Sequence, residues 1–143
     1  MNDAVERIAH TFETLSPEGL AALDAVYAPD ARFKDPFNEV QGLAAIRRIY
    51  ADLFSALLGP RFVVTQRIVQ GSQCVLIWEM HFEFRRWRRG QAQRFVGASH
   101  LVLDAQGRIA EHRDYWDAAE ELYEKLPLLG GLMRALKRRA RAR

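Results

Sequence analysis

Three polar side chains are spaced so that they could perform acid–base chemistry. Asp35 precedes Pro36 at the end of a short segment of alternating polarity, and His112 and Asp114 lie two residues apart. Residues two apart on a β-strand share a face, so His112 and Asp114 can point the same way. A carboxyl group in an apolar environment is a suitable general acid or base near neutral pH. We take Asp35, His112 and Asp114 as candidate catalytic residues.

Aromatic side chains are placed to surround these groups. In 73–87 the apolar residues alternate with Glu79, His81 and Glu83, which predicts a strand with one aromatic face toward the core. The parity of 91–103 turns Phe95 and Ser99 inward as well. The candidate substrate-binding residues are Phe12, Phe33, Trp78, Met80, Phe82, Phe84, Ser99 and Trp116. A concave apolar pocket with a few polar groups is the usual small-molecule site.

Structural roles for the same residues stay open at this stage. Asp35-Pro36 could form a turn whose carboxylate accepts backbone amides, and His112 with Asp114 could be a satisfied buried pair. His81 and His100 could lie side by side on adjacent strands, as a metal site would need. With no third ligand in view, we favour a surface or interface pair and expect no metal.

The elements that must position these residues follow from periodicity. Apolar residues at helical spacing predict helices over 2–14, 17–27 and 43–57, the second ending before Pro29 and the third before Gly59-Pro60. A short strand is expected at 31–35. Period-2 patterns with short turns predict four further strands, at 61–70, 73–87, 91–103 and 108–117. Connections this short make the four an antiparallel meander.

This order predicts an α+β fold. We expect a cone in which three N-terminal helices pack on one face of a curved, mainly antiparallel sheet, followed by a C-terminal helical tail. Residues 1–126 would form a single domain and 127–143 an amphipathic basic helix. The other sheet face must be solvated or covered, which favours a homodimer through that face.

Charge is distributed unevenly along the 143 residues. The formal net charge is +3, but six of the last ten residues are basic, so residues 1–133 carry 15 basic against 18 acidic residues. A basic tail on a mildly acidic body argues against a nucleic-acid-binding surface spread over the whole domain, and we do not favour a nucleic-acid partner. The apolar stripe in the tail could contact a membrane surface, although docking on the domain or a partner subunit is favoured.

The remaining composition indicates a cytoplasmic protein. Cys74 is the single cysteine, which excludes an intramolecular disulfide and a multi-cysteine zinc site. No apolar stretch is long enough to span a bilayer, and the N-terminus shows no signal sequence. Arginine outnumbers lysine 18 to 3, which suggests a GC-rich bacterial genome.

Two segments resemble a known superfamily. Residues 27–36, with Pro29, Asp35 and Pro36, lead into 42–50, and residues 112–117 read His-Arg-Asp-Tyr-Trp-Asp. Together with the element order over about 5–118, these segments resemble the SnoaL-like and ketosteroid-isomerase-like branch of the nuclear transport factor 2-like superfamily. The resemblance is specific for the fold and weak for the reaction, because this cone serves many functions.

The resemblance implies roles for single residues. Asp35 matches the proton-shuttling aspartate of the ketosteroid isomerases, whose oxyanion donors would fall at Thr11 or Phe12 and at Ser99. Neither position keeps the donor, which argues against steroid isomerisation and leaves enolisation open. Asp114 matches an acid/base aspartate of SnoaL-like polyketide cyclases.

Two further positions bear on related activities. His100 has the spacing at which those cyclases carry a histidine, although its parity turns it outward. The Arg and Asp of limonene epoxide hydrolases are replaced by Gly97 and Ser99, which excludes that hydrolysis.

The sequence therefore predicts a small-molecule-binding protein. The favoured function is acid–base isomerase or cyclase chemistry on an apolar carbonyl compound, with Asp35 and Asp114 shuttling protons and His112 assisting. Trp116 and Phe82 would pack the substrate, and no metal or organic cofactor is expected. The alternative is a non-catalytic ligand-binding or dimerisation module of the same fold.

Overall fold

The computed structural model describes residues 2–86, 89–116 and 138. Its helical elements are α1 (Asn2–Glu13), a 3-10 helix η1 (Pro17–Ala22), α2 (Leu23–Val26) and α3 (Leu43–Ala56). Its strands are β1 (Tyr27–Lys34), β2 (Glu39–Gln41), β3 (Leu57–Gln70), β4 (Gln73–Phe84), β5 (Gln93–Leu103) and β6 (Ile109–Tyr115). Residues 87–88 and the expected tail helix (127–143) lie outside the description, apart from residue 138.

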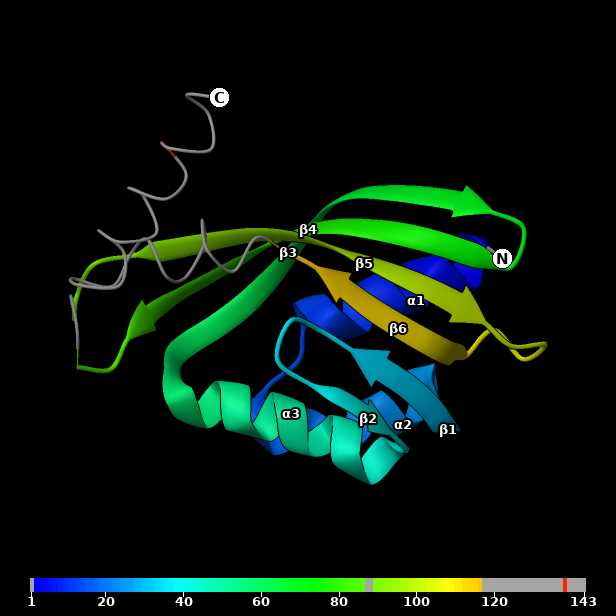
Figure 1. The fold of residues 1–143 in the computed structure, drawn as a ribbon, viewed down its shortest axis with the longest axis horizontal. Helices are drawn as coiled ribbons and strands as arrows, with labels where there is room; N and C mark the ends of the chain where they lie inside the picture. The colour runs from blue at the N-terminus through cyan, green and yellow to red at the C-terminus, as the bar shows by residue number, and fades with distance from the viewer. Residues whose placement is uncertain (1, 87–88, 117–137, 139–143) are drawn as a thin grey trace.

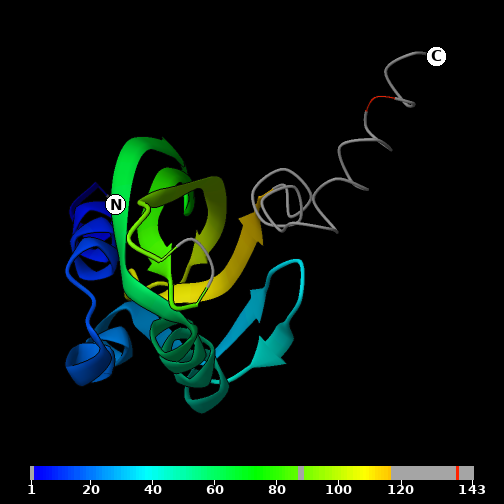
Figure 2. The ribbon, with the colours of Figure 1, turned by 90° about the vertical axis from the view of Figure 1, so that its left-hand side faces the viewer.

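The six strands form one curved sheet with the helices along one side (Figures 1 and 2). The strand order is β2-β1-β6-β5-β4-β3. The predicted meander is confirmed, because β3, β4, β5 and β6 pair antiparallel in sequence order. β1 joins β6 in parallel, which makes the sheet mixed. The α+β cone is thus the observed fold.

The N-terminal boundaries differ from the predicted ones. The second helix is a 3-10 turn plus one α-turn that ends at Val26, and β1 already begins at Tyr27 and runs through Pro29. The β1–β6 register shifts between Tyr27 and Arg32, so proline's missing amide falls where the ladder is already irregular. Because proline was taken to interrupt regular structure, the strand was predicted to begin at residue 31 instead of Tyr27.

A second proline led to a similar error. β3 begins at Leu57 and passes through Gly59 and Pro60, where its register with β4 also shifts. β3 is an edge strand, where a proline needs no ladder partner on its outer side. The three-residue strand β2 was not predicted at all, because a run this short has no measurable period.

The predicted inward faces are confirmed. Trp78, Met80 and Phe82 on β4 and Phe95 on β5 are buried in one apolar cluster. A second cluster joins α1, α3 and the β1–β6 pair around Ile8, Tyr27 and Ile46. The opposite face of the sheet leaves Val96 and Tyr115 exposed. None of the described helices is long and apolar enough to cross a membrane.

Candidate functional site

Strand register brings the candidate residues together. β1 lies parallel to β6 with Phe33 opposite His112, and their ring centroids are 4.7 Å apart. β5 lies antiparallel to β6 with Ser99 opposite Asp114. Because residues two apart share a face, His112 and Asp114 both point to the helix side, as predicted.

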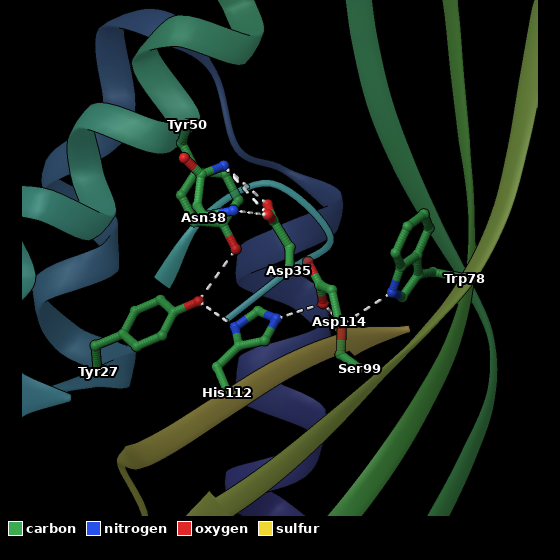
Figure 3. A network of polar contacts seen from close by, with 8 residues as sticks. All are labelled: Tyr27, Asp35, Asn38, Tyr50, Trp78, Ser99, His112 and Asp114. Atoms are coloured by element: carbon green, nitrogen blue, oxygen red, sulfur yellow. Dashed lines mark hydrogen bonds and ion pairs between the residues drawn. The ribbon is translucent and has the colours of Figure 1, made fainter. Parts of the chain in front are cut away.

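A line of hydrogen bonds runs through the interior from α3 to β6 (Figure 3). The Tyr50 and Tyr27 hydroxyls are 3.1 Å apart, and Tyr27 Oη is 2.6 Å from His112 Nδ1. His112 Nε2 is 2.6 Å from Asp114 Oδ1. Tyr27 is fully buried and His112 is 3% exposed, so the middle of this line is shielded from bulk solvent.

Asp114 Oδ1 also has a hydrogen-bond partner on β5. The Ser99 hydroxyl donates to Asp114 Oδ1 at 2.5 Å, and the Trp78 indole N–H donates to Ser99 Oγ at 2.9 Å. Both hydrogen bonds to Asp114 therefore fall on Oδ1. No described residue bonds Oδ2, and the Asp114 side chain keeps 17% of its surface exposed. Among the described residues, Oδ2 is thus the oxygen left to accept a hydrogen bond from an incoming molecule.

Burial keeps both phenols of this line protonated. Burial raises the pKa of Tyr27 well above its ordinary value, and the neighbouring Tyr50 adds to the effect. Burial also raises the pKa of Tyr50, with the negative charge of Asp114 as the next cause. A protonated phenol always has one hydrogen to donate, so both tyrosines act as donors at any physiological pH.

Asp35 holds a turn together. Its Oδ1 accepts the backbone amides of Phe37 at 2.8 Å and Asn38 at 2.6 Å. The Asn38 side-chain amide donates to both carboxylate oxygens at 3.2 Å. This is the turn arrangement named as an alternative to a catalytic role, and it leaves neither oxygen of Asp35 without a partner.

A cavity of about 400 Å³ lies between α3, the 35–38 turn and the sheet. Aromatic and aliphatic side chains form most of its wall, and the ionisable residues in the wall include Asp35, Asp52 and Asp114. No lysine or arginine of the described chain lines it. Such a cavity suits an uncharged organic molecule and opposes an anionic one.

Most of the predicted site residues line this cavity. They are Phe12, Phe33, Asp35, Trp78, Met80, Phe84, Ser99, His112, Asp114 and Trp116. Phe82 does not: it is buried against Phe84 and Phe95, at ring-centroid distances of 5.2 and 4.7 Å. Phe12 rather than Thr11 occupies the first-helix position, since Thr11 bonds the Arg7 carbonyl outside the cavity.

The histidine pair considered for a metal does not form. His81 lies opposite Arg94, and His100 lies opposite Val75. Their side chains contact different residues, Glu79 for His81 and Gln73 for His100. Among the described residues, no group of three His, Cys, Asp or Glu could hold a metal ion.

The sequence reasoning missed three members of the site. Tyr27 was assigned to the end of a helix and Tyr50 to an apolar stripe, so neither phenol was considered. Their hydrogen bonds join residues 23 and 85 positions apart, which no local pattern reveals. Asn38 was detectable, because Asp-Pro-Phe-Asn has the composition of an Asx turn.

Comparison with known proteins assigns the chain to a family. Residues 8–112 match the SnoaL-like domain. The chain belongs to the SnoaL-like family. The observed cone is also the fold of solved structures described as ketosteroid isomerase-like and NTF2-like.

One relative in sequence and one solved structure are similar to this chain over most of its length. A steroid Delta-isomerase from Nocardioides simplex is 29% identical over 113 residues, which cover 76% of this chain and 85% of the relative. A protein with a ketosteroid isomerase-like fold from Catenulispora acidiphila, solved with trimethylamine, superposes with a TM-score of 0.69 at 16% identity, covering 83% and 88% of the two chains.

An epoxide hydrolase of the limonene type offers a contrast. The LEH-like enzyme from M. tuberculosis superposes with a TM-score of 0.66 at 15% identity, covering 94% of this chain and 90% of the other. At this identity the likeness concerns the fold. Gly97 and Ser99 remain where the resemblance to those hydrolases requires Arg and Asp.

Proposed function

We propose that this SnoaL-like protein binds a small, uncharged carbonyl compound and catalyses proton transfer at the carbon next to the carbonyl, as in an isomerisation or cyclisation. The observation that carries the proposal is Oδ2 of Asp114, which no described residue bonds, at the wall of an apolar cavity. A carboxylate in such a place can take a proton from a bound molecule and return it at another atom.

The two oxygens of Asp114 have different roles in this proposal. Ser99 and His112 hold Oδ1, which fixes the direction of the carboxylate. Oδ2 then accepts the substrate proton. Asp35 is assigned to the cavity rim rather than to the proton transfer, because both of its oxygens already accept hydrogen bonds from the turn.

Hydrogen–deuterium exchange tests this function without knowledge of the natural substrate. A panel of enolisable cyclic ketones, steroid ketones included, is incubated with the protein in D₂O, and deuterium at the α-carbon is followed by NMR. We expect exchange above the buffer rate for at least one ketone. The variant Asp114→Asn should lower that rate by about 100-fold or more, since a general base contributes roughly 10²–10⁴-fold.

Glu111→Gln is the matched control. Glu111 lies on the same strand but is exposed on the opposite face, outside the cavity wall. Its variant should exchange at the wild-type rate. Ketone binding without catalysed exchange would instead support the non-catalytic ligand-binding alternative, and exchange that survives Asp114→Asn would reject the assignment of Asp114.

A further inference from the structure

The donor and the acceptor of each hydrogen bond in the buried line follow from the Trp78 end. The Trp78 indole N–H is a donor only, so Ser99 Oγ accepts from it. The single hydroxyl hydrogen of Ser99 is then free to go to Asp114 Oδ1, which is the next polar atom at 2.5 Å. Oδ1 is therefore an acceptor.

The same reasoning extends across the imidazole. An acceptor at Oδ1, 2.6 Å from His112 Nε2, requires the hydrogen on Nε2. In a neutral imidazole, Nδ1 then carries no hydrogen and must accept one. Tyr27 Oη is the only described group bonded to it, at 2.6 Å, and Tyr27 keeps its proton because burial raises its pKa.

From this we propose that Tyr27 is a positioning residue: its hydroxyl donates to His112 Nδ1 and so holds the imidazole as the tautomer whose Nε2–H donates to Asp114 Oδ1. Tyr50 completes the line by donating to the Tyr27 oxygen. Tyr27 does not line the cavity and acts only through His112. Because His112 then donates to Asp114 Oδ1, that oxygen stays occupied. Oδ2 is left without a bond from any described residue.

The opposite tautomer would disrupt the site at two places. With the hydrogen on Nδ1, the bare Nε2 of His112 would face the acceptor Oδ1 of Asp114, lone pair against lone pair. The Asp114 carboxylate would then be held at Oδ1 by Ser99 alone. Tyr27 prevents this state because a buried Nδ1 that already accepts a hydrogen bond cannot also carry a proton without that hydroxyl turning away.

Nitrogen NMR tests the tautomer directly and needs no substrate. The chain has 4 histidines, so the His112 signals are identified by their loss in His112→Gln. In ¹⁵N-labelled wild type at neutral pH, we expect a protonated Nε2 and an unprotonated, hydrogen-bonded Nδ1. A proton on Nδ1, whether in the other neutral tautomer or in the imidazolium, would overturn the proposal.

The variant Tyr27→Phe isolates the hydroxyl. We expect the Nδ1 resonance to move to the position of an imidazole nitrogen without a donor and signals of a second tautomer to appear. Tyr50→Phe is the matched control, because it removes one buried phenol of the same line but leaves the Tyr27 donor, and it should keep the wild-type tautomer. Unchanged His112 shifts in Tyr27→Phe would also overturn the proposal.

The kinetic part of this inference rests on the proposed function. Tyr27→Phe should lower the turnover number for α-proton exchange about tenfold, the value of one buried hydrogen bond, with little change in KM. A turnover number in Tyr27→Phe no lower than in Glu111→Gln would contradict a role of the donor to His112. If no ketone undergoes catalysed exchange, the proposed function fails, whereas the NMR result on the tautomer still decides the role of Tyr27.

Discussion

Gly97 is the residue that lets the Trp78 ring lie where it does. A Cβ added at Gly97 would come within 2.5 Å of two atoms of the outer ring of Trp78. The indole N–H of the same side chain donates to Ser99, which in turn donates to Asp114. The absence of a side chain on β5 is therefore connected, through two hydrogen bonds, to the orientation of the candidate general base.

Substituting Gly97 tests this connection at the scale of one methyl group. Gly97→Ala should push the indole away and lower the free energy of unfolding by about 1–3 kcal/mol, as overpacking of a core does. Urea unfolding measures the loss. In a Trp78→Phe background the same substitution should cost less, because the three ring atoms that the methyl group would meet are gone. An equal cost in both backgrounds would show that Trp78 is not the obstacle.

At the scale of secondary-structure elements, the turn between β1 and β2 forms one rim of the cavity. Asp35, Phe37 and Asn38 all line the cavity, and the carboxylate of Asp35 ties the other two backbone amides to the end of β1. Phe37 in turn lies against Trp116, with ring centroids 5.6 Å apart. The turn therefore connects β1 to the residue that follows β6.

Two substitutions at Asp35 separate a turn-forming role from a catalytic one. Asn keeps an acceptor oxygen for both backbone amides, so Asp35→Asn should unfold near the wild-type urea concentration and keep α-proton exchange within about threefold. Asp35→Ala removes the acceptor and should cost about 1–2 kcal/mol for two hydrogen bonds. Loss of exchange in a stable Asp35→Asn variant would restore Asp35 as a proton-transfer residue.

The accuracy of the prediction from sequence also differs from one strand to another. The faces of β4 and β5 followed from the sequence, because one buried side forces a strict period of 2 over many residues. β1 and the start of β3 did not, since Pro29 and Pro60 lie inside strands at irregular points of the ladder. On β6, the spacing of His112 and Asp114 placed both on one face, and His112 is indeed buried.

The tyrosine line lay beyond any such inference. It depends on the parallel pairing of β1 with β6 and on the packing of α3, which bring together residues far apart in the chain. In the sequence, a phenol in an apolar stripe looks like any other core side chain. Only the three-dimensional arrangement shows that Tyr27 and Tyr50 meet His112.

At the scale of the whole molecule, the buried thiol and the two buried phenols predict that the protein is less stable at alkaline pH. Burial raises the pKa of the Cys74 thiol from 9.0 to about 11 and that of both tyrosines above 10.0. Between pH 9 and 11 the unfolded chain releases these protons while the native protein holds them. The unfolded state then binds fewer protons, so the free energy of unfolding falls as pH rises. Below pH 8 these groups contribute no pH dependence.

Urea unfolding at pH 8 and pH 10.5 measures this effect. The three groups together should remove about 3 kcal/mol over that interval, with the thiol giving the largest part because its proton leaves the unfolded chain first. Cys74→Ala should therefore lose about 2 kcal/mol less than wild type over the same interval. Tyr27→Phe should lose somewhat less than wild type, because only one phenol is removed. Identical losses in wild type and Cys74→Ala would mean that the thiol ionises as readily in the native protein as in the unfolded chain, and so is not sealed within the core.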